Sequence, residues 1–194
     1  MGELVALGDG ASGYLTRNAG SRGVVVAGGS RGLRLEACRA LDLEELVILA
    51  VGGVSAGELI AAAKWLRSML TIGPIGVVAA EAAATGALAL AKVQPVPALA
   101  LLDPPGLHEL GDADGALGAL QAHFPGSGPR LSSASIREEE DRLIQRGLEA
   151  EFFVYPGAVP GFLDPKGPEY GRLAARQVWE RVEIFILEAL DTPR

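Results

Sequence analysis

The 194-residue sequence has no run rich in lysine or arginine, and its formal net charge is −7. Nucleic acids and anionic membranes are normally bound by clustered basic side chains, so neither is expected as a partner. The longest apolar stretch, residues 75–91, is too short to span a bilayer and carries Glu81 in its middle. The first residues also lack the basic and apolar regions of a signal peptide. We therefore expect a cytoplasmic protein that does not bind membranes.

Reactive side chains are scarce as well. The single cysteine, Cys38, excludes an internal disulfide and lies on the apolar side of a predicted helix, so we expect it in the core. There are two histidines. We expect His123, within an apolar strand, to be a core imidazole hydrogen-bonded to backbone, and His108 to lie in a surface loop. A Ser-His-Asp catalytic triad could in principle be formed by Ser30, His108 and Asp103, but nothing in their spacing requires it. Without a cluster at metal-ligand spacing, we expect neither metal nor cofactor.

Short apolar runs bounded by glycine and proline alternate with helical patterns along the chain. The predicted buried strands are residues 22–28, 45–51, 75–80, 96–102, 120–124 and 151–157. The predicted helices are residues 34–43, 55–70, 82–92, 133–147 and 170–190. This alternation predicts an α/β fold with a mostly parallel sheet covered by helices on both faces, and residues 3–17 predict an antiparallel hairpin at its edge. With 49% hydrophobic residues, the chain fits a single domain, residues 1–194.

The glycine-rich turn in VVVAGGSRGL follows a strand and precedes a helix, as in nicotinamide-binding dehydrogenases. However, Arg34 replaces the third glycine, and the next strand ends in ILAVGG without an acidic residue for a ribose. The sequence also contains no Tyr-x-x-x-Lys. We therefore interpret these glycines as residues required by the backbone angles of the turn.

The segment AAEAA, residues 79–83, resembles the nucleophile elbow of α/β-hydrolases. That strained turn needs small residues two positions before and after the nucleophile, and Ala79 and Ala83 meet this requirement. A glutamate at the start of a helix is also favourable in its own right, because it lies at the positive end of the helix dipole. Glu81 is thus a candidate site residue at a turn of recognisable type.

The C-terminal segment EFFVYPGAVPGFLDPKGPEYGRLAARQVWERVEIFILEAL is similar to the last strand, loop and helix of the dienelactone hydrolase family. In that family a Tyr-Pro-Gly-Ala segment leads to the catalytic histidine. The resemblance extends upstream through AAAKWLRSML and IGVVAAEAAATGALALA, and it implies an α/β-hydrolase fold. A stretch usually present after the fourth strand is absent, because Gly52 and Gly53 run almost directly into Ser55. Part of the family's pocket wall is therefore expected to be missing.

The resemblance implies that none of the three catalytic side chains is retained. The nucleophile position is Glu81, the acid position falls at or beside Gly128, and the histidine position is Pro160. Loss of such a unit costs about 10⁴ to 10⁶ in rate. The resemblance also implies that the backbone amides of an oxyanion hole survive, at Ala82 and in the turn of Gly29 and Ser30.

Two interpretations of the substitutions stay open. In the first, the pocket carries out proton-transfer chemistry such as isomerisation, elimination or cyclisation on a small apolar molecule, with Glu81 as general acid or base and Tyr155 or Arg31 as polar helpers. In the second, the protein is a non-catalytic relative that binds a small apolar ligand or a protein partner. A glutamate at a strained turn is a less neutral replacement than alanine or glycine, which favours the first.

Overall fold

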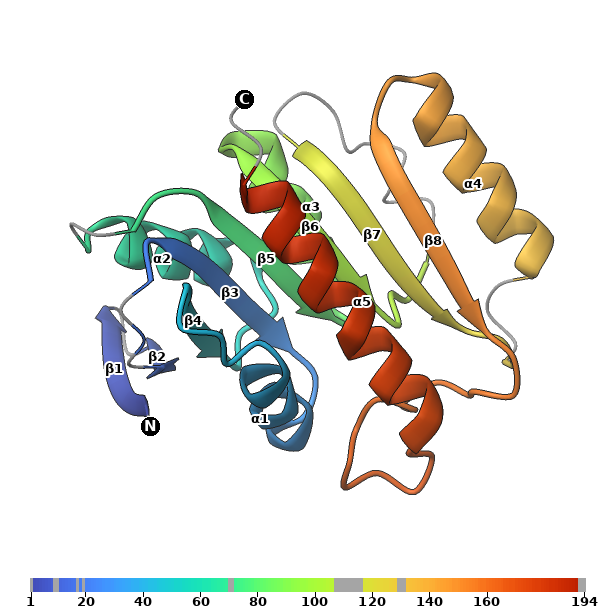
Figure 1. The fold of residues 1–194 in the computed structure, drawn as a ribbon, viewed down its shortest axis with the longest axis horizontal. Helices are drawn as coiled ribbons and strands as arrows, with labels where there is room; N and C mark the ends of the chain where they lie inside the picture. Colours follow the sequence, from blue (N-terminus) through green and yellow to red (C-terminus); the bar gives the residue numbers. More distant parts are fainter. Residues whose placement is uncertain are drawn as a thin grey trace.

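The computed structural model describes residues 2–8, 11–16, 18, 20–69, 72–106, 117–128 and 132–191. Its strands form an eight-stranded sheet in the order β1-β2-β4-β3-β5-β6-β7-β8 (Figure 1). The strands are β1 (Gly2–Gly8), β2 (Ala11–Thr16), β3 (Arg22–Gly28), β4 (Leu46–Val51), β5 (Ile75–Ala80), β6 (Val96–Leu102), β7 (Leu117–Pro125) and β8 (Glu149–Tyr155). The hairpin β1–β2 joins β4 antiparallel, and β4 and the strands beyond it pair in parallel. The predicted sheet and its edge hairpin are confirmed.

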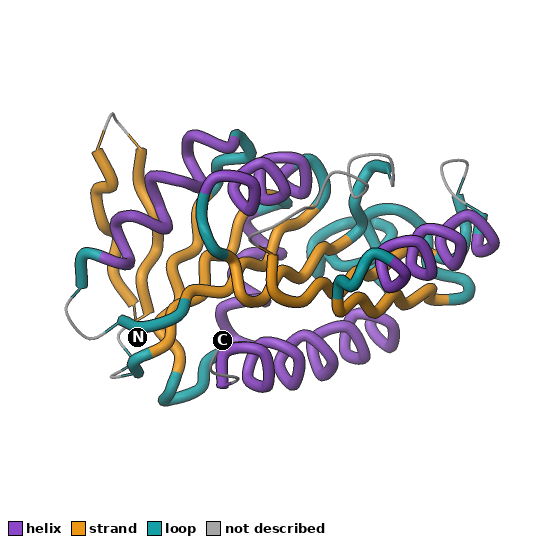
Figure 2. The backbone as a smooth tube through the Cα atoms, turned by 90° about the horizontal axis from the view of Figure 1, so that it is seen from above, coloured by secondary structure: helices purple, strands orange, loops and turns teal. Residues whose placement is uncertain are grey.

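Helices cover both faces of the sheet (Figure 2). The helices are α1 (Arg31–Ala40), α2 (Ala56–Arg67), α3 (Ala83–Val93), α4 (Ser133–Gln145) and α5 (Arg172–Asp191). Apolar side chains of α1 and α5 pack on one face, and those of α2, α3 and α4 pack on the other. No helix in the described part of the chain combines the length and the apolar character needed to cross a bilayer.

The central strands are buried on both sides, which explains why their sequences read as continuous apolar runs. Several boundaries differ from the prediction: α1 spans Arg31–Ala40 where residues 34–43 were expected, and β8 begins at Glu149 where residue 151 was expected. Strand β7 spans Leu117–Pro125 and is longer at both ends than the predicted 120–124. Strand β8 ends at Tyr155 because the chain turns at Pro156 and Gly157, where φ is 78°. The parallel strands β3 to β8 all end at the same edge of the sheet, called here the carboxyl edge.

The connection from β4 to α2 consists of residues 52–55 alone. Helix α2 starts with a capping box, in which the Ser55 hydroxyl accepts from the Glu58 amide and the Glu58 carboxylate accepts from the Ser55 amide. The cap lets the helix begin directly after the strand, without a longer loop. The connection after the fourth strand is thus as short in the structure as the sequence predicts.

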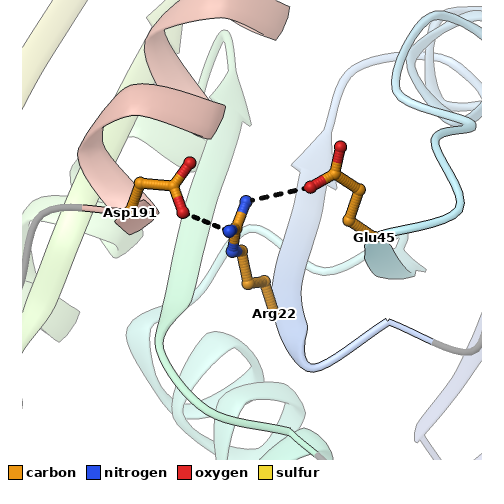
Figure 3. Close-up of polar contacts among 3 residues, drawn as sticks. All are labelled: Arg22, Glu45 and Asp191. Carbon is orange, nitrogen blue, oxygen red and sulfur yellow. Dashed lines mark hydrogen bonds and ion pairs between the residues drawn. The ribbon is translucent and has the colours of Figure 1, made fainter.

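An ion-pair cluster lies at the opposite edge, where the parallel strands begin (Figure 3). Arg22, the first residue of β3, pairs with Glu45 at 3.3 Å and with Asp191 at the end of α5. Both carboxylates are 59% exposed, so each pair contributes at most about 1 kcal/mol. The cluster joins the C-terminal helix to the sheet at a distance from the carboxyl edge.

Candidate functional site

Two acidic residues with unusual backbone angles lie side by side at the carboxyl edge. Glu81 follows β5 with φ 52°, and Asp103 follows β6 with φ 48°; they are the non-glycine residues with positive φ in the described part of the chain. Their preceding residues, Ala80 and Leu102, are partners in adjacent parallel strands. Strained residues of this kind persist where the surrounding structure enforces them, and they concentrate at functional sites. This edge is therefore the candidate site.

The turn at Glu81 is held by backbone hydrogen bonds on both sides. The Glu81 amide donates to the Leu102 carbonyl at 2.8 Å, and the Glu81 carbonyl accepts from the Ala84 amide at 3.0 Å. A Cβ atom at Gly28 would lie 2.4 Å from the Ala80 carbonyl oxygen and 2.5 Å from the Ala83 Cβ. Larger side chains would not fit this approach, which explains the small residues around Glu81. The predicted strand, turn and helix at this position are confirmed.

The glycine-rich turn after β3 lies against the Glu81 turn. Gly28 and Gly29 have φ of 75° and 62°, and a Cβ at Gly29 would lie 3.4 Å from the Ala80 Cβ. The Ser30 hydroxyl caps α1 by accepting from the Leu33 amide at 3.1 Å. One Arg34 nitrogen, Nη1, donates to the carbonyls of Gly28 and Gly29 at 3.1 and 2.6 Å. The structure confirms that the backbone angles require these glycines.

Ala82, predicted as an oxyanion-type donor, is exposed and precedes α3 with φ −60° and ψ −20°. Within the described residues, its amide donates to no backbone carbonyl. The structure therefore places an available amide directly after Glu81. Gly29 and Ser30 lie in the neighbouring turn, after β3, which pairs with β5.

Gly128 and Pro160 come together from the loops after β7 and β8. A Cβ at Gly128 would lie 3.3 Å from the Pro160 ring. Both residues line a small cavity of about 20 Å³ with Asp103 and Ser127, and Glu81 is not among its lining residues. This volume is close to that required for a single water molecule. Carboxylate oxygen Oδ2 of Asp103 accepts from the Gly161 amide at 2.9 Å and so fixes the loop that carries Pro160.

Asp103 entered the sequence analysis only as a member of a possible group with Ser30 and His108, and it was assigned no role of its own. It is 8% exposed, and its amide donates to the His123 carbonyl at 2.9 Å. The available signal was an acidic residue directly after a buried strand and before Pro104. In a parallel sheet such a residue lies at the edge where ligands bind.

Tyr155 and Arg31, the predicted polar helpers, make no polar contact with Glu81 within the described residues. Arg31 is the exposed first residue of α1 and lines a separate cavity. Tyr155 is buried, and its hydroxyl accepts from Arg181 at 3.0 Å and lies 2.8 Å from the His123 Nδ1.

His123 is fully buried, as expected, but its partners are side chains and not backbone. Its Nε2 lies 2.9 Å from the Gln121 Oε1, and the Gln121 Nε2 donates to Glu151 at 3.1 Å. Burial, and secondarily the charge of Arg181, lowers the pKa of His123 to about 3. Burial also raises the pKa of Tyr155. The predicted backbone partner was wrong, because Gln121 of the same strand and Tyr155 of the neighbouring strand β8 supply suitable polar groups. His108 lies outside the described residues.

Among the described residues, no group of three or more His, Cys, Asp or Glu side chains is arranged to hold a metal ion. The Cys38 thiol is 6% exposed in the core, as predicted, and burial raises its pKa to about 11.

No protein-family model matches the sequence, and no curated protein matches it. Solved structures do match. Esterase 2 of Thermogutta terrifontis aligns with a TM-score of 0.76 and 16% identity over 100% of this chain and 97% of its own. A candidate dienelactone hydrolase of Klebsiella pneumoniae aligns with a TM-score of 0.75 and 12% identity over 97% and 98% of the two chains. This chain has the α/β-hydrolase fold.

The same esterase has also been solved phosphorylated by paraoxon, and in that form it aligns with a TM-score of 0.72, 17% identity and coverage of 100% of this chain and 96% of its own. In the α/β-hydrolase fold, the nucleophile occupies a strained strand-to-helix turn at the top of the sheet. Glu81 occupies a turn of that kind after β5.

Proposed function

We propose that this chain is an α/β-hydrolase-fold enzyme that transfers protons on a small apolar molecule, in an isomerisation, elimination or cyclisation, with Glu81 as general acid and base. The observation that carries the proposal is the backbone of Glu81, held at φ 52° at the turn where hydrolases keep a nucleophile. A left-handed conformation costs a non-glycine residue about 1 kcal/mol or more. A chain that needed only the turn would be more stable with glycine there.

Ester hydrolysis fits these residues poorly. We assign the nucleophile, acid and histidine positions to Glu81, Gly128 and Pro160. A carboxylate is a weak acyl nucleophile, and neither glycine nor proline has a side chain that can move a proton. His123 is buried and hydrogen-bonded on both ring nitrogens, so it does not replace the missing base.

Proton transfer uses what the site offers. A carboxylate removes a proton beside a carbonyl and returns it at another atom, so the same group serves as base and then as acid. The amides of Ala82, Gly29 and Ser30 would stabilise the negative charge that develops on the substrate oxygen. Asp103 holds the loop of Gly161 beside the turn. We assign no role in this step to Arg31 or Tyr155, because neither makes a polar contact with Glu81.

The test replaces the carboxylate of Glu81 by an amide of the same size. Small lactones, enones and polyenes are screened for a rise in melting temperature, and each hit is followed for chemical conversion by mass spectrometry and NMR. Glu81→Gln should bind a hit but no longer convert it, because the titratable proton is lost. Glu183→Gln is the matched control, since Glu183 is a half-buried carboxylate on α5, and it should convert the hit as the wild type does.

The alternative is a non-catalytic relative that binds a ligand or a partner, and the cavity of about 20 Å³ beside Pro160 favours it. That cavity does not accommodate a substrate, whereas small-molecule sites usually enclose roughly 300 to 1,000 Å³. Hits that bind wild type and Glu81→Gln equally and stay unchanged for days would establish this alternative.

Under either function, paraoxon should not label residue 81. Covalent labelling there, or saturable esterase activity, would contradict both.

A further inference from the structure

A second cavity lies away from the Glu81 turn, between the β1–β2 hairpin, the end of β4 and helix α1. Its volume is about 580 Å³, within the range typical of small-molecule sites. Tyr14 and Gly13 line it from the hairpin, Gly53 lines it after β4, and Arg31 and Cys38 line it from α1. Glu81, Asp103 and Pro160 are not among its lining residues.

The short chain connections explain why this cavity is open. Strand β2 pairs with β4 only from Gly13 to Leu15, so the rest of the hairpin is not paired with β4. The connection of residues 52–55 supplies no segment to cover the gap. Leu4 lines the cavity and is 79% exposed, which is costly for a large apolar side chain unless something covers it.

Two cations occupy one wall. Arg31 and Arg34 are three residues apart on α1 and therefore lie on the same side of the helix. Arg34 Nη1 is engaged by the carbonyls of Gly28 and Gly29, which holds its guanidinium in place. The described residues provide no carboxylate within ion-pair distance of Arg31.

Glu58, the acidic residue that lines the cavity, already has hydrogen-bond donors to its carboxylate. The Glu58 carboxylate accepts from the Ser55 amide at 3.2 Å and from the Ser55 hydroxyl at 2.6 Å, and these bonds lower its pKa. Glu58 therefore stays ionised, and among the described residues it forms no ion pair with Arg31 or Arg34. An anionic group is attracted to the α1 wall and repelled from the Glu58 end.

We propose that this cavity binds a small monoanion in which a carboxylate is joined to an apolar chain of medium length. The carboxylate pairs with Arg31 and Arg34, and the chain covers Leu4 and the apolar wall formed by Leu35 and Cys38. Arginine is suited to this role because its planar guanidinium binds a carboxylate through two parallel hydrogen bonds. The site is distinct from the proposed proton-transfer site, because Glu81 does not line it, and Arg34 joins the two through its bonds to the Gly28 and Gly29 carbonyls.

The test titrates octanoate into the full-length protein, with binding followed by calorimetry and by amide NMR. We expect shifts concentrated at Gly13, Gly52 and Gly53, which line the cavity. Arg31→Gln should weaken octanoate binding at least about tenfold, as expected for loss of a charge-assisted hydrogen bond. 1-Octanol, which has the same chain without the charge, should bind wild type more weakly by a similar factor.

Arg39→Gln is the matched control, because Arg39 lies on the same helix, is exposed and does not line the cavity. It should bind octanoate as the wild type does, and so should Glu81→Gln. No binding at millimolar octanoate would overturn the proposal. Amide NMR shifts centred on Gly128 and Gly161 would also overturn it. The same holds for an equal loss of octanoate affinity in Arg31→Gln and Arg39→Gln, or for equal affinities of the wild type for octanol and octanoate. Loss of binding in Glu81→Gln would instead place the carboxylate ligand at the Glu81 turn.

Discussion

Lowering the pH from 7 to 5 should destabilise this protein through His123. The imidazole lies in a chain of polar groups whose donors can be assigned one by one. The Gln121 amide nitrogen donates to Glu151, and the Gln121 oxygen can only accept, so Nε2 of His123 carries the proton and donates to it. Nδ1 of His123 then accepts from the Tyr155 hydroxyl, whose oxygen accepts from Arg181. A second proton on the ring would break the bond from Tyr155.

The sign and size of the effect follow from the two pKa values. The pKa of His123 is about 3 in the folded protein, whereas that of histidine in an unfolded chain is about 6.5. Between these values the unfolded state binds more protons, so the stability present above pH 6.5 is lost progressively as the pH falls towards 3. By pH 5 the loss is about 2 kcal/mol relative to pH 7. That is a large fraction of a typical domain stability of about 5 to 15 kcal/mol.

The assay is urea denaturation of wild type and His123→Gln at pH 7, 6 and 5. Glutamine keeps a donor for Gln121 but does not titrate. The variant should be less stable at pH 7 by about 1 to 3 kcal/mol, because a buried hydrogen bond is weakened. Between pH 7 and 5 the free energy of unfolding should decrease in both proteins, and the decrease should be about 2 kcal/mol smaller in the variant because residue 123 no longer titrates. An equal fall in both proteins would refute the reasoning, because all other titrating groups are shared.

Three further predictions test the local geometry. Glu81→Gly should raise the free energy of unfolding, measured by urea denaturation, by about 1 kcal/mol, because glycine adopts φ 52° without strain. A lower free energy of unfolding in the variant would show that the carboxylate stabilises the turn. Gly28→Ala should lower the free energy of unfolding by about 2 kcal/mol or more, because the added Cβ would lie 2.4 Å from the Ala80 carbonyl oxygen. Gly57→Ala, with open space around the added carbon, should raise the free energy of unfolding by about 0.5 to 1 kcal/mol. Cys38 should react with a thiol reagent at pH 8 far more slowly in the folded protein than in urea, because burial raises its pKa to about 11; equal rates would contradict its placement in the core.

The fold could be predicted because local sequence and tertiary structure agree in this chain. Each central strand is an apolar run, as expected of a strand buried on both faces, and β3, β4 and β5 are each followed by a helical pattern of sufficient length. The errors concern boundaries. The sequence EFFVYPG was predicted as strand through Gly157, but the strand ends at Tyr155, where pairing with β7 ends.

The candidate site was predictable only in part. Glu81 was recognised because its neighbours are small and the turn has a known pattern. Tyr155 was predicted as a polar helper of Glu81, but its hydroxyl bonds to His123 and Arg181. Which face of the sheet a side chain occupies at the end of a strand depends on how the chain turns there, and a one-residue shift reverses it. Asp103 was named only in a possible group with Ser30 and His108, because a single aspartate after a strand carries no distinctive pattern of its own.

The sequence by itself determined the order of elements, the burial of the strands and the small residues that permit the Glu81 turn, because these depend on local patterns of size, polarity and backbone freedom. Only the tertiary structure decided that Glu81 and Asp103 are neighbours and that Gly128 touches Pro160. It also decided that the cavity of about 580 Å³ is lined by Arg31 and not by Glu81. These relations join residues from different strands, and they are set by strand order and register in the sheet, which no local pattern encodes.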